Sequence, residues 1–113
     1  MPFEADLVMD VRFLSNPYFL PALKPMTGED QPVIDYVLST PQAVQFLEKL
    51  EGMMAFLVPL YQQEGKAYLT LAIGCTGGRH RSVTVANELG RSLTKKGCKI
   101  RVRHRDINKG EEV

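Results

Sequence analysis

Cysteine and histidine are scarce in this sequence, which has two of each among its 113 residues. Two cysteines are too few for a disulfide framework, so we expect both Cys75 and Cys98 to be free thiols. His80 and His104 stand alone rather than in the paired spacing of metal ligands. The sequence therefore gives no support for a bound metal, and we expect no cofactor.

Long apolar segments are also missing, because no stretch of the chain approaches the length needed to cross a bilayer. The N-terminus carries Glu4 and Asp6 and lacks the basic leader and apolar stretch of a secretion signal. These features predict a cytoplasmic protein that does not enter a membrane. A chain of 113 residues suffices for one hydrophobic core, so we expect a single domain over residues 1–113.

The net charge of +1 hides an asymmetry between the two halves of the chain. Residues 1–64 hold three basic and nine acidic residues, whereas residues 65–113 hold eleven basic and four acidic residues. An ordinary surface can segregate its charges in this way. A basic face for phosphates or nucleic acid would give the same pattern, and charge alone leaves both interpretations open.

Hydrophobic periodicity predicts the order strand, loop, helices, strand, helix, strand. The expected strands are 6–14, 68–74 and 99–104, the expected helices are 32–38, 41–65 and 79–96, and residues 15–32 form a long loop. Helices between strands imply parallel crossovers. We therefore predict an α/β fold, a small three-layer-like domain with a mostly parallel sheet.

The same periodicity predicts which side chains face the core. In the first strand Phe13 should share one face with Leu7, Met9 and Val11, and in the long helix Val44 should begin the apolar face. Met53 and Met54 are both expected to fill the core. Thr40 and Pro41 resemble an N-cap and a first helical residue.

The segment from Gly74 to Ser82 predicts an anion-binding loop between a buried strand and a helix. Gly77 and Gly78 permit a tight turn whose N–H groups, with those of the first helical turn, would point toward an anion. Arg81 adds a bidentate donor, and further hydrogen bonds come from the side chains of Thr76, His80 and Ser82. The alternative without a bound ligand is that the two glycines form only a tight turn and the arginines point to solvent.

A catalytic alternative follows from Cys75, because five residues separate it from Arg81 and Ser82, the spacing of the cysteine-phosphatase loop. A helix N-terminus lowers a thiol pKa and so favours the nucleophilic thiolate. Such an enzyme would need a general acid, for which the candidates are Asp10, Glu29, Asp30 and Asp106. Hydrolysis of nucleoside triphosphates is not supported, because no lysine precedes a hydroxyl residue at the helix start.

Several separated motifs together resemble the C-terminal domain of the RNase adapter protein RapZ. These motifs are residues 10–14, Asn16-Pro17, Thr27-Gly28, residues 74–82 and His104-Arg105. Members of that family usually carry an N-terminal nucleotide-binding domain as well, so the chain resembles the C-terminal domain by itself. The resemblance implies a non-catalytic sensor of glucosamine 6-phosphate that binds a small RNA, presents it to a ribonuclease and self-associates.

The resemblance also implies roles for individual residues. Phosphate ligands would come from Thr76, Gly77, Gly78, His80 and Arg81, with Cys75 and Ser82 as parts of the same loop, while Asp10, Arg12 and Asn16 would lie near the sugar. Tyr18 stands where the best-known relative has a histidine, so ligand specificity is expected to differ there. A basic RNA-binding face would comprise Lys95, Lys96, Lys99, Arg101, Arg103 and Arg105, although Glu111 and Glu112 dilute the positive charge of the C-terminus.

Overall fold

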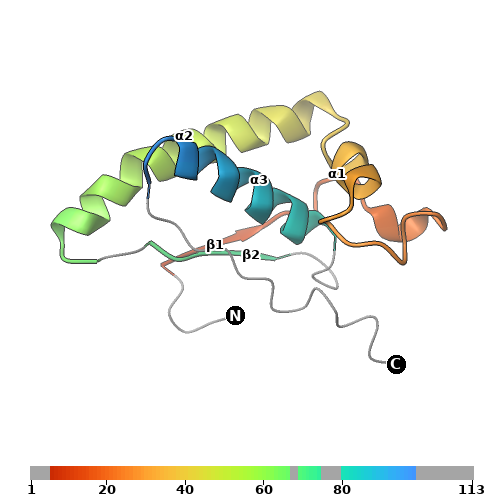
Figure 1. The fold of residues 1–113 in the computed structure, drawn as a ribbon, viewed down its shortest axis with the longest axis horizontal. Helices are drawn as coiled ribbons and strands as arrows, with labels where there is room; N and C mark the ends of the chain where they lie inside the picture. The colour runs from red at the N-terminus through yellow and green to blue at the C-terminus, as the bar shows by residue number, and fades with distance from the viewer. Residues whose placement is uncertain (1–5, 67–68, 75–79, 99–113) are drawn as a thin grey trace.

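The computed structural model describes residues 6–66, 69–74 and 80–98. Its elements are β1 (Leu7–Asp10), a 3₁₀ turn η1 (Pro17–Phe19), α1 (Gln31–Val37), α2 (Pro41–Gln63), β2 (Leu71–Gly74) and α3 (Arg81–Lys95). This part of the chain is a mixed α/β structure in which most residues are helical, as Figure 1 shows. Within the same ranges, no helix combines the length and the apolar composition that a membrane span requires.

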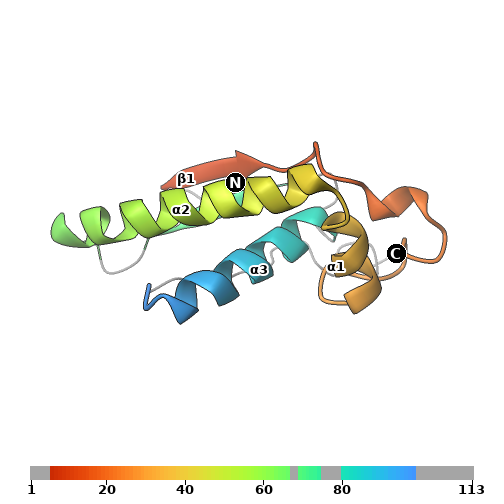
Figure 2. The same cartoon turned by 90° about the horizontal axis from the view of Figure 1, so that it is seen from above.

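The two strands are parallel, with Leu7 opposite Leu71 and Asp10 opposite Gly74. The chain passes from β1 to β2 through η1, α1 and α2. α2 and α3 lie side by side over one face of the strand pair (Figures 1 and 2). The predicted parallel pairing is therefore confirmed. The described residues form two layers, one of strands and one of helices, and no third layer is seen among them. The expected strand 99–104 lies outside these residues and stays a prediction.

β1 ends four residues earlier than the sequence pattern predicts. The carboxylate of Asp10 accepts a hydrogen bond from the backbone N–H of Arg12 at 2.9 Å, and the N–H of Leu14 donates to the carbonyl of Val11 at 3.1 Å. These bonds turn the chain, so the alternation of a strand no longer applies. As a result Val11 and Leu14 are buried and Phe13 is 61% exposed, so the prediction that Phe13 shares a face with Val11 is wrong.

α2 has the bounds that its capping residues predict. The hydroxyl of Thr40 accepts from the N–H of Ala43 at 3.1 Å, Pro41 is the first helical residue, and Gly65 follows the helix with a φ of 92°. Most of the predicted apolar face is confirmed, since Leu50 and Met54 are buried and Leu47, Leu57 and Tyr61 pack against the core. Ala43 and Val58 are also buried.

Two predicted core residues of α2 lie on its surface. Val44 is 47% exposed and Met53 is 41% exposed, so both predictions are wrong. Each is the chain neighbour of a buried residue, and consecutive helical residues point about 100° apart. The apolar character of both residues in each pair, Ala43 and Val44 or Met53 and Met54, did not show which of the two faces the core.

α3 confirms the predicted amphipathic helix. Val83, Leu89 and Leu93 are buried, and the helix is followed by Gly97, whose φ of 81° suits a helix stop. The core lies between the three helices and the inner face of the strand pair. It comprises Val11, Leu14, Val33, Val37, Ala43, Leu50, Met54, Val58, Leu69, Val85, Leu89 and Leu93.

Candidate anion-binding site

Three elements meet at one edge of the strand pair. β1 ends at Asp10, β2 ends at Gly74, and α3 begins at Arg81 on the same side of the molecule (Figure 1). This is the carboxyl edge, where α/β folds place ligands. The predicted loop residues Cys75, Thr76, Gly77 and Gly78 lie outside the described residues, whereas their flanks are described.

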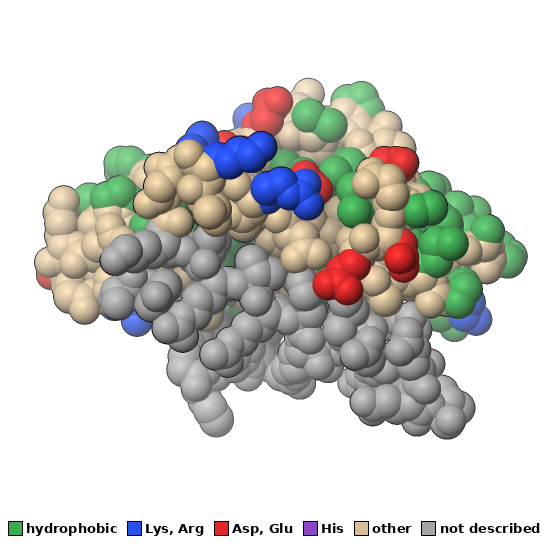
Figure 3. Space-filling model, in the orientation of Figure 1, with side chains coloured by type: hydrophobic (Ala, Val, Ile, Leu, Met, Phe, Trp, Pro, Cys, Tyr) green, Lys and Arg blue, Asp and Glu red, His purple; other side chains and the backbone are tan. Residues whose placement is uncertain are grey.

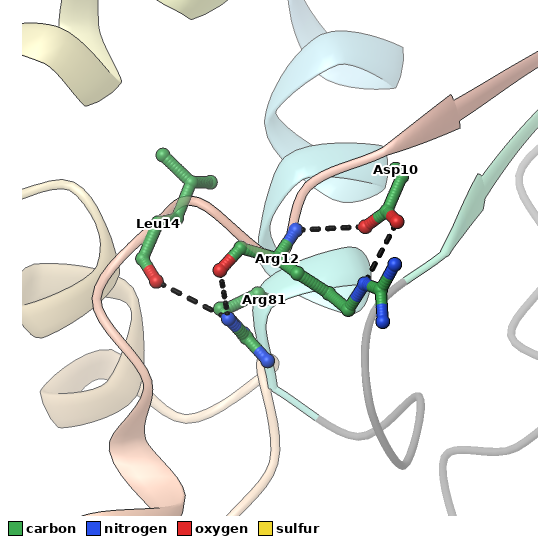
Figure 4. Close-up of polar contacts among 4 residues, drawn as sticks. All are labelled: Asp10, Arg12, Leu14 and Arg81. Atoms are coloured by element: carbon green, nitrogen blue, oxygen red, sulfur yellow. Dashed lines mark hydrogen bonds and ion pairs between the residues drawn. The ribbon is translucent and has the colours of Figure 1, made fainter.

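Arg81 is 4% exposed, and its guanidinium is turned toward the segment that follows β1. Nη1 donates to the backbone carbonyls of Arg12 at 2.5 Å and of Leu14 at 3.3 Å (Figure 4). Nε is buried and has no hydrogen-bond partner. No carboxylate of the described ranges forms an ion pair with this side chain. Arg81 is thus a buried cation that donates to the backbone of the turn after β1, and its Nε remains without an acceptor.

Asp10 and Arg12 form an ion pair beside this arginine. Oδ2 of Asp10 lies 2.7 Å from Nε of Arg12, and both side chains are more than half exposed. The hydrogen bond from the backbone N–H of Arg12 is the largest cause that lowers the pKa of Asp10 from its ordinary value of 3.8, and desolvation, the second largest, opposes it. The side-chain hydrogen bond and charge of Arg12 and the charge of Arg81 lower the pKa further. Asp10 is therefore an anion at neutral pH, and it orients the guanidinium of Arg12.

His80 and Ser82 flank Arg81 and are buried, at 6% and 7% exposed. Nε2 of His80 lies 3.2 Å from the carbonyl oxygen of Lys24, a hydrogen bond in which the ring nitrogen is the donor. His80 therefore connects the start of α3 to the long loop after β1. The structure brings Asp10, Arg12, His80, Arg81 and Ser82 of the predicted set to one edge.

Gly28 is a residue of this edge that the predicted site did not include. A Cβ atom at this position would lie 2.4 Å from the carbonyl oxygen of His80 and 2.6 Å from the backbone nitrogen of Thr84. The hydroxyl of Thr84 also donates to the carbonyl of Gly28 at 3.3 Å. The loop backbone is therefore packed directly against the first turn of α3, and only glycine fits. The Thr27-Gly28 pair in the sequence was the available signal.

Asn16 and Tyr18 belong to the turn η1 rather than to the contacts around Arg81. The side-chain oxygen of Asn16 accepts from the backbone N–H of Tyr18 at 3.1 Å and so caps the turn. Tyr18 is 52% exposed, and Nζ of Lys24 lies 4.5 Å from its ring centroid. Among the described contacts none joins these two residues to Asp10, Arg12 or Arg81, so their predicted place near the sugar stays a prediction.

Two of the predicted RNA-binding residues are described, and both are exposed. Lys95 lies at the end of α3, and Nζ of Lys96 lies 2.6 Å from Oε1 of Glu51 on α2. Figure 3 shows Lys and Arg side chains gathered on the face that α3 forms, with acidic side chains beside them. The ion pair with Glu51 partly neutralises Lys96. The other four residues of the predicted face lie outside the described ranges.

Cations and hydrogen-bond donors dominate this edge. Within the described parts of the chain, no group of three His, Cys, Asp or Glu side chains could hold a metal ion. An open depression at the edge is lined in part by Asp10, Arg12 and Phe13. The arrangement can hold an anion between arginines and a helix N-terminus, with a carboxylate at its border.

A parallel strand pair whose carboxyl edge meets a helix N-terminus and a buried arginine defines a small α/β domain with a candidate anion site. The family model described as the RapZ C-terminal domain matches residues 1–108. The chain belongs to the RapZ C-terminal domain family.

Relatives of the chain include proteins named "Nucleotide-binding protein" from several bacteria. The one from Geobacter metallireducens is 56% identical over 110 residues, which are 97% of this chain and 39% of the relative. Those from Desulforamulus reducens and Moorella thermoacetica are 56% and 53% identical over 107 residues, which are 95% of this chain and 36% of each relative. The chain therefore spans less than two fifths of the length of these relatives, and their name describes the longer proteins.

Proposed function

We propose that this chain is a non-catalytic sensor domain that binds a phosphorylated amino sugar such as glucosamine 6-phosphate at the carboxyl edge of the strand pair. The observation that carries the proposal is Arg81, a 4% exposed guanidinium with an unpartnered Nε and no carboxylate partner among the described residues. A buried charge is costly unless it is paired. A bound phosphate beside this guanidinium would supply the missing negative charge.

The border of the site suggests how an amino sugar would be distinguished from other phosphorylated sugars. Asp10 is exposed and ionised. It is the last residue of β1, directly before the turn whose carbonyls accept hydrogen bonds from Arg81. Its carboxylate can accept a hydrogen bond from an ammonium group, which an ordinary sugar lacks. Asp10 engages the Nε and the backbone N–H of Arg12 and leaves its Nη atoms as further donors for a ligand.

Calorimetry with glucosamine 6-phosphate tests the proposal, with glucosamine, inorganic phosphate and glucose 6-phosphate as comparisons. We expect the amino sugar phosphate to bind most tightly. The variant Arg12→Ala should weaken binding by about tenfold or more, because a charge-assisted hydrogen bond is lost. Arg91→Ala is a matched control, since Arg91 is also exposed and pairs with a carboxylate, that of Glu88 at 2.8 Å.

Two results would contradict the proposal. One is the absence of saturable heat with any phosphorylated sugar. The other concerns the proposal that the domain is not a catalyst. If the native chain hydrolyses an aryl phosphate and Cys75→Ser does not, the result would support the phosphatase interpretation of the Cys75 and Arg81 spacing.

We also propose that the domain binds RNA through its basic C-terminal half, as the family resemblance implies. Lys95 is exposed and free of ion pairs with the other described residues, whereas Lys96 is engaged by Glu51. Lys95→Ala should therefore weaken RNA binding more than Lys96→Ala does. Fluorescence anisotropy across a salt series would measure this, and an affinity that does not fall as salt rises would contradict an electrostatic interface.

A further inference from the structure

Phe13 is an exposed aromatic residue at the candidate anion site, and phosphate binding does not explain it. It is 61% exposed although the apolar residues of the same turn, Val11 and Leu14, are buried. The open depression at the carboxyl edge is lined in part by Phe13 together with Asp10 and Arg12. A phosphate needs cations and N–H donors, and a phenyl ring offers neither. An apolar side chain at this place is suited to an apolar part of a ligand.

The ring of Phe13 is supported by a second aromatic ring. Its centroid lies 5.0 Å from that of Phe46 on α2, and the two planes meet at 81°, an edge-to-face arrangement that aromatic pairs favour. Phe46 is half-buried and packs against the core, so it is anchored in the helical layer. One edge-to-face contact covers at most one face of Phe13. The rest of the ring is available to a ligand in an orientation that the protein already holds.

The backbone on both sides of Phe13 is fixed by Arg81. Nη1 of this arginine donates to the carbonyl oxygens of Arg12 and Leu14, which directly precede and follow the phenylalanine (Figure 4). The guanidinium that we propose to bind the phosphate thus also positions the aromatic residue. A site that is held in its binding conformation before the ligand arrives loses less entropy on binding. A ligand whose phosphate contacts Arg81 would meet a Phe13 that is already in place.

We infer that Phe13 stacks against the carbon–hydrogen face of the sugar ring of a phosphorylated hexose, and so makes the site specific for a ligand with a closed ring. This inference rests on the proposed function and adds a residue to it. The hydrogens on one face of a pyranose carry a slight positive charge, and the face of an aromatic ring is negative. Ligand sites combine such apolar contacts with a few fixed polar groups. Three parts of one ligand are then recognised separately: the phosphate by Arg81, the ammonium group by Asp10 and the ring by Phe13.

Ring stacking and ammonium recognition predict different losses among ligands. Phe13→Ala should weaken the binding of glucosamine 6-phosphate and of glucose 6-phosphate alike, by about tenfold each, because both contain the ring. It should leave the affinity for inorganic phosphate nearly unchanged. Asp10→Asn should instead lower the affinity for the amino sugar more than that for glucose 6-phosphate. Open-chain sorbitol 6-phosphate lacks the ring, so the native chain should prefer glucose 6-phosphate to it, and Phe13→Ala should lose this preference.

Calorimetry with these ligands tests the inference on the native chain and on three variants of Phe13. Phe13→Tyr keeps the aromatic face and should bind like the native chain, whereas Phe13→Leu keeps only apolar bulk and should resemble Phe13→Ala. Phe56→Ala is the matched control, since Phe56 is 68% exposed on α2 and is not among the described residues that line the depression. It should bind every ligand like the native chain. Circular dichroism checks that all variants fold.

Nuclear magnetic resonance of the ligand reports the contact itself. Protons that lie over the face of an aromatic ring are shifted upfield by its ring current. The ring protons of glucosamine 6-phosphate should therefore shift upfield on binding to the native chain, and less on binding to Phe13→Leu. This shift depends on the contact with the ring and not on the stability of the fold.

The outcomes separate this inference from the proposed function. Equal affinities of the native chain and Phe13→Leu for glucose 6-phosphate, or equal ligand shifts in both, would overturn the stacking and leave the proposed function in place. A loss in Phe13→Ala that extends equally to inorganic phosphate would also overturn it, because Phe13 would then only support the fold of the site. If the native chain binds no phosphorylated sugar, the proposed function fails and this inference fails with it.

Discussion

Nη1 of Arg81 donates to the carbonyl oxygen of Arg12 at 2.5 Å and thereby fastens the first turn of α3 to the turn that follows β1. The two residues are far apart in the sequence; Arg81 was predicted to hold the phosphate and Arg12 to lie near the sugar. Their contact gives Arg81 a structural role besides the phosphate binding that we propose. A guanidinium can serve both roles because its donors form a planar fork with several directions.

Replacing Arg81 should therefore affect stability as well as binding. Arg81→Ala removes the hydrogen bonds to Arg12 and Leu14 and leaves their carbonyls without this donor, at an expected cost of about 2–4 kcal/mol in the free energy of unfolding. Urea denaturation measures this. Arg91→Ala, which removes an exposed ion pair, should cost less than about 1 kcal/mol. Equal costs would contradict the structural role of Arg81.

Gly28 should be intolerant of any side chain. Gly28→Ala places a methyl group within 2.4 Å of the carbonyl oxygen of His80, so the loop or α3 must shift. We expect a loss of about 1–3 kcal/mol in stability and weaker ligand binding. Gly52→Ala is the matched control, because nothing lies within 4 Å of a Cβ at that helical position. It should stabilise the protein by about 0.5–1 kcal/mol.

The adjacent methionines of α2 should respond differently to truncation. Met54 is fully buried, so Met54→Ala leaves a cavity and should cost about 2–5 kcal/mol. Met53 is 41% exposed, and Met53→Ala should change the free energy of unfolding by less than about 0.5 kcal/mol. Thermal or chemical denaturation of the two variants compares them directly. A larger loss from Met53→Ala would mean that α2 is rotated about its axis relative to the structure.

The ion pair of Asp10 should give the protein a specific acid sensitivity. Because the pKa of Asp10 in the folded state lies below its ordinary value of 3.8, its carboxylate stabilises the fold above that pH, and the contribution is lost as pH falls through the lowered pKa. Asp10→Asn should thus be less stable than the native chain from neutral pH down to about pH 4. The difference should close in stronger acid, and one that widens there would contradict the assignment.

Local chemistry in the sequence determined much of this fold. The bounds of α2 follow from Thr40, Pro41 and Gly65, because capping and positive φ depend on the residues themselves. The parallel crossover follows from the order of elements. The sequence also pointed to the strand-to-helix edge and to Arg81, since a glycine pair and basic residues before a helix are readable without knowledge of the rest of the chain.

Contacts between distant segments were decided only by the tertiary structure. That Arg81 bonds to the carbonyls of Arg12 and Leu14, and that Gly28 packs against the start of α3, depends on where the loop crosses the helix. The exposure of Phe13 and Met53 has the same origin: apolar type defines an approximate face, and the packing of neighbouring elements decides which side chains that face includes. The sequence therefore identified the candidate anion-binding edge, and only tertiary packing determined how its arginines are held there.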